Sequence, residues 1–185
     1  MVLKVAITGN IASGKSQVEK IVEKYFCVYD TDKIAHNILN EIKDFYGYDV
    51  FTEGIVDRKK LGSLVFKNPE LKEKLEKIVH PKVKDKIVEI FEKHKNDKAV
   101  FISVPLLFEA GFEILFDKII LVKADENIRL KRLMERYNFS EAEAISRIKS
   151  QISQEEKTSD YVIENNSSFE ELEKQTLSVL KNLSN

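Results

Sequence analysis

The chain of 185 residues contains one cysteine, three prolines, six glycines and no tryptophan. A single cysteine excludes an intramolecular disulfide framework and any metal site built from several cysteines. No stretch approaches the roughly 18 uninterrupted apolar residues of a membrane-spanning helix. Residues 1–8 also lack the basic segment and long apolar run of a signal peptide. These absences predict a cytoplasmic protein without a membrane partner.

An excess of charge of one sign is also missing, because 30 basic residues face 31 acidic ones and the formal net charge is −1. A chain so balanced has no general attraction for nucleic acid, so we expect no nucleic-acid partner and only a local site for any anion. Hydrophobic residues make up 43% of the chain, enough for the core of one globular domain. The composition leaves the oligomeric state open.

Five short apolar segments have the β-branched and aromatic composition of buried strands. They are residues 3–8, 26–30, 99–104, 118–122 and 161–163. Helical patterns separate them, for example at residues 14–24, 127–136 and 169–183. Strands that alternate with helices predict an α/β fold with a five-stranded parallel sheet, whose ligands bind at the carboxyl ends of the strands.

The spacing of these strands is uneven. Residues 31–98 contain no convincing strand but show helical patterns at 69–79 and 81–95. The first is opened by Asn68 as N-cap and Pro69 at the first helical position. We therefore expect a mostly helical insertion between the second and third strands. Two short polar helices are expected within residues 138–157.

Residues 9–16, GNIASGKS, match the pattern G-x-x-x-x-G-K-[ST] without a mismatch, directly after the first predicted strand. The glycines let backbone N–H groups turn inward around phosphates, and the following helix adds its positive end. Lys15 would reach the β- and γ-phosphates, and the Ser16 hydroxyl would ligate Mg²⁺. The motif and its context predict a nucleoside triphosphate site.

Two classes of phosphate-loop protein fit poorly. A GTPase needs an N-K-x-D base-reading motif, which is absent, and the D-x-x-G at residues 44–47 does not end a predicted strand. A motor ATPase usually has an aspartate at the end of an apolar strand, yet residues 99–104 run directly into Pro105. A small-molecule kinase remains.

Asp30-Thr31-Asp32 stands where the second predicted strand ends. If this segment is extended, residues two apart project to the same side. One or both carboxylates can then take the proton of an acceptor hydroxyl or hold Mg²⁺ through water. We favour Asp32 as this catalytic group. The alternative is that Asp30 or Thr31 simply caps a helix over residues 33–39.

Arginine is scarce, with five in the chain, and four of them fall between residues 129 and 147. Arg129, Arg132 and Arg136 lie at helical spacings of three and four, and Arg147 follows. The clustering favours a mobile flap whose guanidinium groups bind phosphate oxygens. Surface ion pairing with neighbouring glutamates is the alternative.

With these features in place, the chain resembles the dephospho-coenzyme A kinase family over nearly its whole length. The resemblance rests on ITGNIASGKS and DTDKIAH, then IVHPKV and VPLLFEAG, and finally RLKRLMER, RIKSQ and DYVIEN. The loop motif alone is shared by many nucleotide-binding proteins. The ordered set is specific, above all HPKV followed by PLLFEAG.

The resemblance implies ATP-dependent phosphorylation of the ribose 3′-hydroxyl of dephospho-coenzyme A, with Mg²⁺. It also implies an adenylate-kinase-like P-loop core over residues 1–30 and 98–185, an acceptor-binding insertion over residues 31–97, and a lid over residues 127–157. The implied ATP contacts are Ala12, Ser13, Gly14, Lys15, Ser16 and Gln17, with Arg136 on the lid and Asn165 beside the adenine. The implied acceptor contacts are Asp32, His80, Leu106, Phe108 and Glu109.

Some of these residues have plainer alternatives. A histidine before a proline often ends a helix and hydrogen-bonds locally, which is the alternative for His80. For Leu106–Phe108 the alternative is core packing that continues the third strand, which leaves Glu109 as the better functional candidate. The family usually has Ser or Thr where Gln17 stands, and a glycine-containing turn where residues 166–168 are Asn-Ser-Ser. The rival functions are a shikimate kinase and a non-catalytic nucleotide-binding module.

Overall fold

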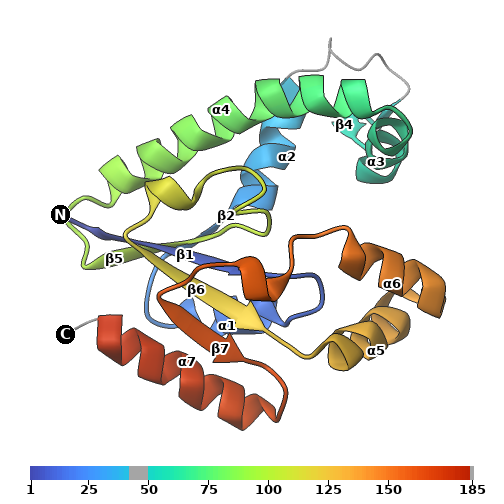
Figure 1. Cartoon of the computed structure of the whole chain (residues 1–185). Coiled ribbons are helices and arrows are strands. Elements are labelled where there is room, and N and C mark those ends of the chain that lie inside the picture. The colour runs from blue at the N-terminus through green and yellow to red at the C-terminus, as the bar shows by residue number, and fades with distance from the viewer. Residues whose placement is uncertain (42–49, 184–185) are drawn as a thin grey trace. The chain divides into compact units, whose positions relative to one another are not determined.

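The computed structural model of the chain describes residues 1–41 and 50–183, so the D-x-x-G segment at residues 44–47 lies outside it (Figure 1). The structure divides into two compact units. The first unit comprises Met1–Tyr29 and His94–Asn185, and the second comprises Asp30–Lys93. Among the described residues, no helix has both the length and the apolarity needed to cross a membrane.

A five-stranded parallel sheet forms the centre of the first unit, which confirms the predicted fold class. Its strands are β1 (Leu3–Gly9), β2 (Val28–Asp30), β5 (Ala99–Ser103), β6 (Lys118–Lys123) and β7 (Tyr161–Glu164), in the spatial order β2-β5-β1-β6-β7. Val5 in the central strand pairs with Phe101 of β5 on one side and Lys118 of β6 on the other. The carboxyl ends of β5, β1 and β6 therefore meet at one edge, where the phosphate motif begins.

Helices α1 (Lys15–Val22) and α7 (Phe169–Leu183) pack against each other, and Figure 1 shows α7 below the sheet and α1 behind β6 and β7. Their apolar stripes, which include the buried Val18, Ile21 and Leu172, pack against the β1 side chains Val5 and Ile7. The first unit also contains α5 (Glu126–Tyr137), α6 (Glu141–Lys149) and the short 3₁₀ helices η3 (Glu113–Leu115) and η4 (Gln154–Glu156). The α5–α6 pair has its own small core around Leu133, Ala144 and Ile148.

The second unit contains α2 (Thr31–Glu41), α3 (Arg58–Lys67) and α4 (Pro69–Lys93), and it corrects the prediction of two helices at 69–79 and 81–95. Helix α4 runs through Pro81 without a break. A proline inside a helix removes one backbone hydrogen bond. The buried residues Leu75, Val79, Val83, Ile87 and Phe91 nevertheless continue at steps of four across the proline. Their continuous burial offsets the missing bond.

The prediction that residues 31–98 contain no strand was also wrong. A two-stranded antiparallel hairpin joins β3 (Phe51–Thr52) to β4 (Ile55–Val56). Glu53 and Gly54, between the strands, have φ angles of 53° and 79°, the left-handed pair that a tight hairpin turn requires. Strands of two residues are too short to show an alternating pattern in the sequence.

Candidate active site

The phosphate motif forms the connection between β1 and α1, as predicted. Ser13 N donates to the carbonyl of Asn10 at 3.0 Å, and Ala12 and Gly14 have φ angles of 60° and 94°. Gly14 is needed for a second reason, because a Cβ atom there would lie 1.8 Å from Asn165 Nδ2. The loop is thus a tight backbone turn at the N-terminus of a helix, the arrangement that binds phosphates.

Two hydrogen bonds to a distant segment hold this loop in place. Asn10 Nδ2 donates to the carbonyl of Ile152 at 2.9 Å, and the backbone N–H of Ile11 donates to Gln151 Oε1 at 2.7 Å. Both partners belong to the segment between α6 and η4. The sequence motif marks the loop but not these supports, since they lie about 140 residues away in the chain.

Asn165, predicted beside the adenine, lies directly against the phosphate loop. Its side chain is buried, and Nδ2 donates to the carbonyl of Ser13 at 2.9 Å. The same Nδ2 is 3.4 Å from Gln17 Oε1, so the unusual Gln17 side chain is a partner for Asn165. These contacts place Asn165 at the loop, while the adenine contact stays a prediction.

The four clustered arginines do not act as one group. Arg132 donates from Nη1 to the carbonyl of Ala12 at 3.2 Å and from Nη2 to that of Asn165 at 2.9 Å, and burial lowers the pKa of its guanidinium. Arg136 lies over the ring of Tyr137 and Arg147 over that of Phe139, each within 6 Å of the ring centroid. In the part of the chain that is described, none of the four forms an ion pair with a glutamate.

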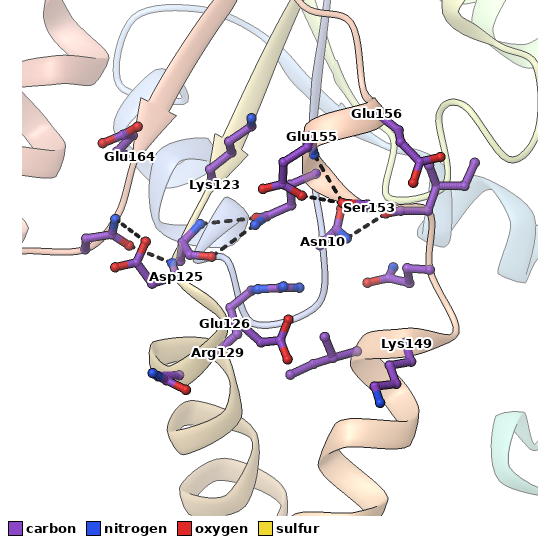
Figure 2. Close-up of a pocket in the computed structure, with 17 residues that line it drawn as sticks. Asn10, Lys123, Asp125, Glu126, Arg129, Lys149, Ser153, Glu155, Glu156 and Glu164 are labelled. Atoms are coloured by element: carbon purple, nitrogen blue, oxygen red, sulfur yellow. Dashed lines mark hydrogen bonds between the residues drawn. The ribbon is translucent and has the colours of Figure 1, made fainter.

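Arg129, the first of the four, is only 5% exposed and lines a cavity of about 870 Å³ (Figure 2). The cavity is bordered by the first turn of α5, the segment from Ile148 to Glu156, and Asn10. Nε and Nη1 of Arg129 have no hydrogen-bond partner. Burial lowers the pKa of its guanidinium, and the carboxylates of Glu126 and Glu155 oppose that shift.

Lys15 and Ser16 are the two side chains of the motif expected to contact the phosphates and Mg²⁺, and their surroundings differ. Ser16 is exposed at the first turn of α1. Lys15 is held, because its Nζ lies 2.6 Å from Glu19 Oε1 and also contacts Ser103 Oγ at the end of β5. Ser103 Oγ in turn donates to Glu19 Oε1 at 2.6 Å. Sequence reasoning missed both Glu19 and Ser103.

The Asp30-Thr31-Asp32 segment is not extended as predicted. Helix α2 begins at Thr31, and Asp30 Oδ1 accepts a hydrogen bond from the backbone N–H of Asp32 at 2.8 Å. The capping alternative therefore holds for Asp30. Asp32 is an exposed residue in the first turn of α2, with a side chain that does not share a strand face with Asp30.

His80 lies inside α4, so the expectation that it ends a helix is wrong. Two neighbouring leucines after β5 differ in exposure, since Leu107 is fully buried while Leu106 is 49% exposed. Core packing thus accounts for Leu107 but not for Leu106. The roles proposed for His80 and Leu106 stay predictions.

Glu109 lies beside a lysine that sequence reasoning missed. Lys157 Nζ is 3.5 Å from Glu109 Oε1 and 5.8 Å from the centre of the Phe108 ring. The Lys157 side chain is fully buried. Burial lowers its pKa, and the charge of Glu109 opposes that shift. Glu109 and Phe108 are thus held by one cation.

Cys27, His94 and Asp97 offer metal-binding atoms that all lie within 4.8 Å of one another. However, His94 Nε2 is 2.8 Å from the hydroxyl of Tyr29, and His94 Nδ1 is 2.6 Å from Asp97 Oδ2. Both ring nitrogens are therefore engaged by protein atoms. We interpret this cluster as a hydrogen-bonded link between the start of β2 and the turn that follows α4.

Comparisons with known proteins identify the family of the chain. The model of the dephospho-CoA kinase family matches residues 3–171. The dephospho-CoA kinase of Fusobacterium nucleatum is 45% identical, over 92% of this chain and 93% of that protein. The crystal structure of dephospho-CoA kinase from Campylobacter jejuni superimposes with a TM-score of 0.75 at 34% identity, over 100% of this chain and 98% of that one.

The rival activity has a more distant counterpart. A shikimate kinase from Bacteroides thetaiotaomicron superimposes with a TM-score of 0.55 at 12% identity, over 99% of each chain. At that identity the likeness shows a shared fold and nothing about the substrate.

Proposed function

Because the chain belongs to the dephospho-CoA kinase family, we propose that it transfers the γ-phosphate of ATP to the ribose 3′-hydroxyl of dephospho-CoA. The products are CoA and ADP, and the reaction is the last step of CoA biosynthesis. The family match carries this conclusion, and the tight turn of residues 9–16 at the start of α1 supports it.

The phosphate loop is the proposed binding site of the ATP phosphates. The backbone N–H groups of Ala12 to Gln17 and the N-terminus of α1 favour negative charge there. Lys15 adds a cation for the β- and γ-phosphates. The exposed Ser16 hydroxyl is an oxygen donor of the kind that suits Mg²⁺, which when bound neutralises developing charge on the phosphate oxygens.

Asp32 is the proposed catalytic carboxylate. It orients the 3′-hydroxyl and accepts its proton as the hydroxyl oxygen forms a bond to the γ-phosphorus and the bond to ADP breaks. Asp30, whose carboxylate is already engaged by the backbone N–H of Asp32, has a structural role instead. The two carboxylates therefore provide a matched pair for a test.

The second unit is the proposed acceptor-binding part, with His80 among its contacts. Leu106, Phe108 and Glu109 of the first unit are also proposed acceptor contacts. Residues 127–157 are the proposed lid. A lid that covers ATP excludes water and so favours transfer to an acceptor over hydrolysis. Arg136 is the lid residue proposed to contact phosphate, because among the described residues its guanidinium lies over the Tyr137 ring and forms no ion pair.

The decisive experiment is a coupled ADP-release assay with ATP and Mg²⁺, run with dephospho-CoA, with shikimate and with no acceptor. ADP release that depends on dephospho-CoA is the expected result. Release with shikimate, or with none of the three, would overturn the assignment. The second of these outcomes would favour a binding module.

Asp32→Asn should retain ATP binding and lose turnover by orders of magnitude. Asp30→Asn should stay close to wild type, because asparagine also caps helices.

A further inference from the structure

Strand β5 ends without an acidic residue, yet a carboxylate is present at its end. Many phosphate-loop enzymes place an aspartate there, close to the loop's Ser or Thr and its metal. In this chain β5 ends at Ser103, which is fully buried. The carboxylate of Glu19 reaches Ser103 from α1, on the other side of the phosphate loop.

The three groups form a closed hydrogen-bonded triangle. Ser103 Oγ donates its one proton to Glu19 Oε1 at 2.6 Å, so it must accept from Lys15 through a lone pair. Lys15 Nζ also donates to Glu19 Oε1 at 2.6 Å. An ammonium group has three N–H donors, and two are used here. The third N–H of Lys15 remains for a phosphate oxygen, and its direction is set by the other two.

Helix stability alone does not explain this pair. Within a helix, an acid four residues before a base is the more favourable order, because it complements the helix dipole. Lys15 and Glu19 have the reverse order and lie at the positive end of α1. Their side chains are each only 16% exposed, so both groups also lose much of their hydration. Because the charge order and the lost hydration both oppose stability, the pairing of Lys15 with Glu19 indicates a role in phosphate binding or transfer.

We propose that Glu19 is the positioning residue of the phosphate-loop lysine, and that α1 supplies the carboxylate that strand β5 lacks. Glu19 and Ser103 together fix the Lys15 ammonium so that its free N–H meets the phosphate that is being transferred. The inference rests on the proposed kinase function, but it concerns how this chain builds the site and makes its own predictions for nucleotide binding.

Glu19→Ala is the first variant. We expect kcat to fall on the order of 10- to 100-fold, since a misplaced cation stabilises the transition state less well. ATP binding measured by calorimetry without Mg²⁺ should be unchanged or tighter, because a negative charge leaves the neighbourhood of the triphosphate. A merely structural role predicts the opposite pattern, a lower Tm and weaker ATP binding. Glu23→Ala changes an exposed carboxylate at the C-cap of α1, four residues further along the chain, and as the control it should match wild type.

Relocating the carboxylate gives a sharper test. In the variant Glu19→Ala with Ser103→Asp, an acid stands at the end of β5, and we expect kcat to recover to within about tenfold of wild type. Because Ser103 is buried, this variant may be tested for folding by its Tm before its activity is read. A folded double variant with no recovery overturns the proposal.

A double-mutant cycle keeps the proposal testable even if the relocated variant does not fold. If Glu19 acts through Lys15, Glu19→Ala should lower kcat little further in a Lys15→Ala background. An equal further loss in that background, or wild-type kcat for Glu19→Ala alone, contradicts the proposal. If wild type itself does not turn over dephospho-CoA, the proposed function fails, while the ATP-binding comparison still tests Glu19.

Discussion

The guanidinium of Arg132 joins the phosphate loop to the end of β7, because Nη1 lies 3.2 Å from the carbonyl of Ala12 and Nη2 lies 2.9 Å from the carbonyl of Asn165. The Asn165 side chain completes the link by donating to the carbonyl of Ser13. A planar fork with two donors fits this bridge, and the single ammonium of a lysine does not. Arg132 therefore supports the loop from the first helix of the proposed lid.

Arg132→Lys should weaken ATP binding while it preserves charge. The variant loses at least one charge-assisted hydrogen bond, worth about 1.5–3 kcal/mol, so part of the loop support is lost. We expect the Kd for ATP, measured by calorimetry, to rise about tenfold. Arg147→Lys is the matched control, because Arg147 lies over Phe139 and makes no contact with the loop. Equal ATP affinities for both variants would show that the bridge does not support the site.

Two glycines give a second matched test. Gly14→Ala introduces a side chain where φ is 94° and where its Cβ would lie 1.8 Å from Asn165 Nδ2. We expect loss of ATP binding and a loss of stability of about 2 kcal/mol or more, because the strained backbone and the clash add. Gly62→Ala lies in helix α3 with no atom within 4 Å of its Cβ, and it should be neutral or stabilising by up to about 1 kcal/mol. Thermal unfolding and ATP calorimetry on both variants measure the contrast.

The sequence predicts the sheet and the phosphate loop because both depend on local information. A short apolar run before G-x-x-x-x-G-K-S fixes a strand, a turn and a helix start in one stretch of chain. The same local reasoning failed at Pro81, where the buried stripe from Leu75 to Phe91 outweighs the lost hydrogen bond. It also failed at Asp30, whose side chain caps helix α2, so that Asp32 lies in the first turn of a helix and not at the end of a strand.

The supports of the site could not be predicted in this way. Gln151, Asn165 and Arg132 reach the loop across more than 100 residues of chain. Their positions follow from the pairing of β6 with β1 and of β7 with β6, and no spacing in the sequence encodes that order of strands. The arginine cluster did single out Arg132. Only the structure separates Arg132 at the loop from Arg129 in its buried cavity.

Helix α6 of the proposed lid begins with a capping box, which yields a third prediction. Ser140 Oγ accepts from the backbone N–H of Glu143, and the Glu143 carboxylate accepts from the backbone N–H of Ser140 at 2.9 Å. Ser140→Ala should cost about 1 kcal/mol of local stability. Hydrogen exchange of the α6 amides should accelerate about fivefold, while amides of α7 stay unchanged. Unchanged exchange in α6 would mean that the box does not hold the helix start.

The same box makes α6 sensitive to acid. Hydrogen bonds from Ser140 lower the pKa of Glu143 below its ordinary 4.5. A carboxylate with a depressed pKa stabilises the folded helix above that ordinary value, and its contribution is lost as pH falls through the lowered pKa. The faster exchange caused by Glu143→Gln should therefore be evident at pH 6. The difference from wild type should shrink as the pH falls below 4.5 and through the lowered pKa.

The ion pair between Lys157 and Glu109 predicts that the stability of the fold also depends on pH in the alkaline range. Burial lowers the pKa of Lys157 below 10.5, and Glu109 limits that shift. Between the lowered pKa and 10.5, the unfolded chain binds more protons than the folded one, so this lysine makes stability rise with pH. Lys157→Met should remove that rise. Chemical unfolding from pH 7 to 10.5, expressed as the difference between variant and wild type, isolates the contribution from the other lysines.

Glu109→Gln should have the reverse effect on the same curve. Without the opposing carboxylate the pKa of Lys157 falls further, so the rise in stability should begin at a lower pH. At pH 7 the unpaired buried ammonium should cost about 1–3 kcal/mol. Adding Lys157→Met to Glu109→Gln should recover most of that loss, because no buried charge remains. If Glu109→Gln instead keeps full stability and raises only the KM for dephospho-CoA, the glutamate serves the acceptor and its pairing with Lys157 is incidental.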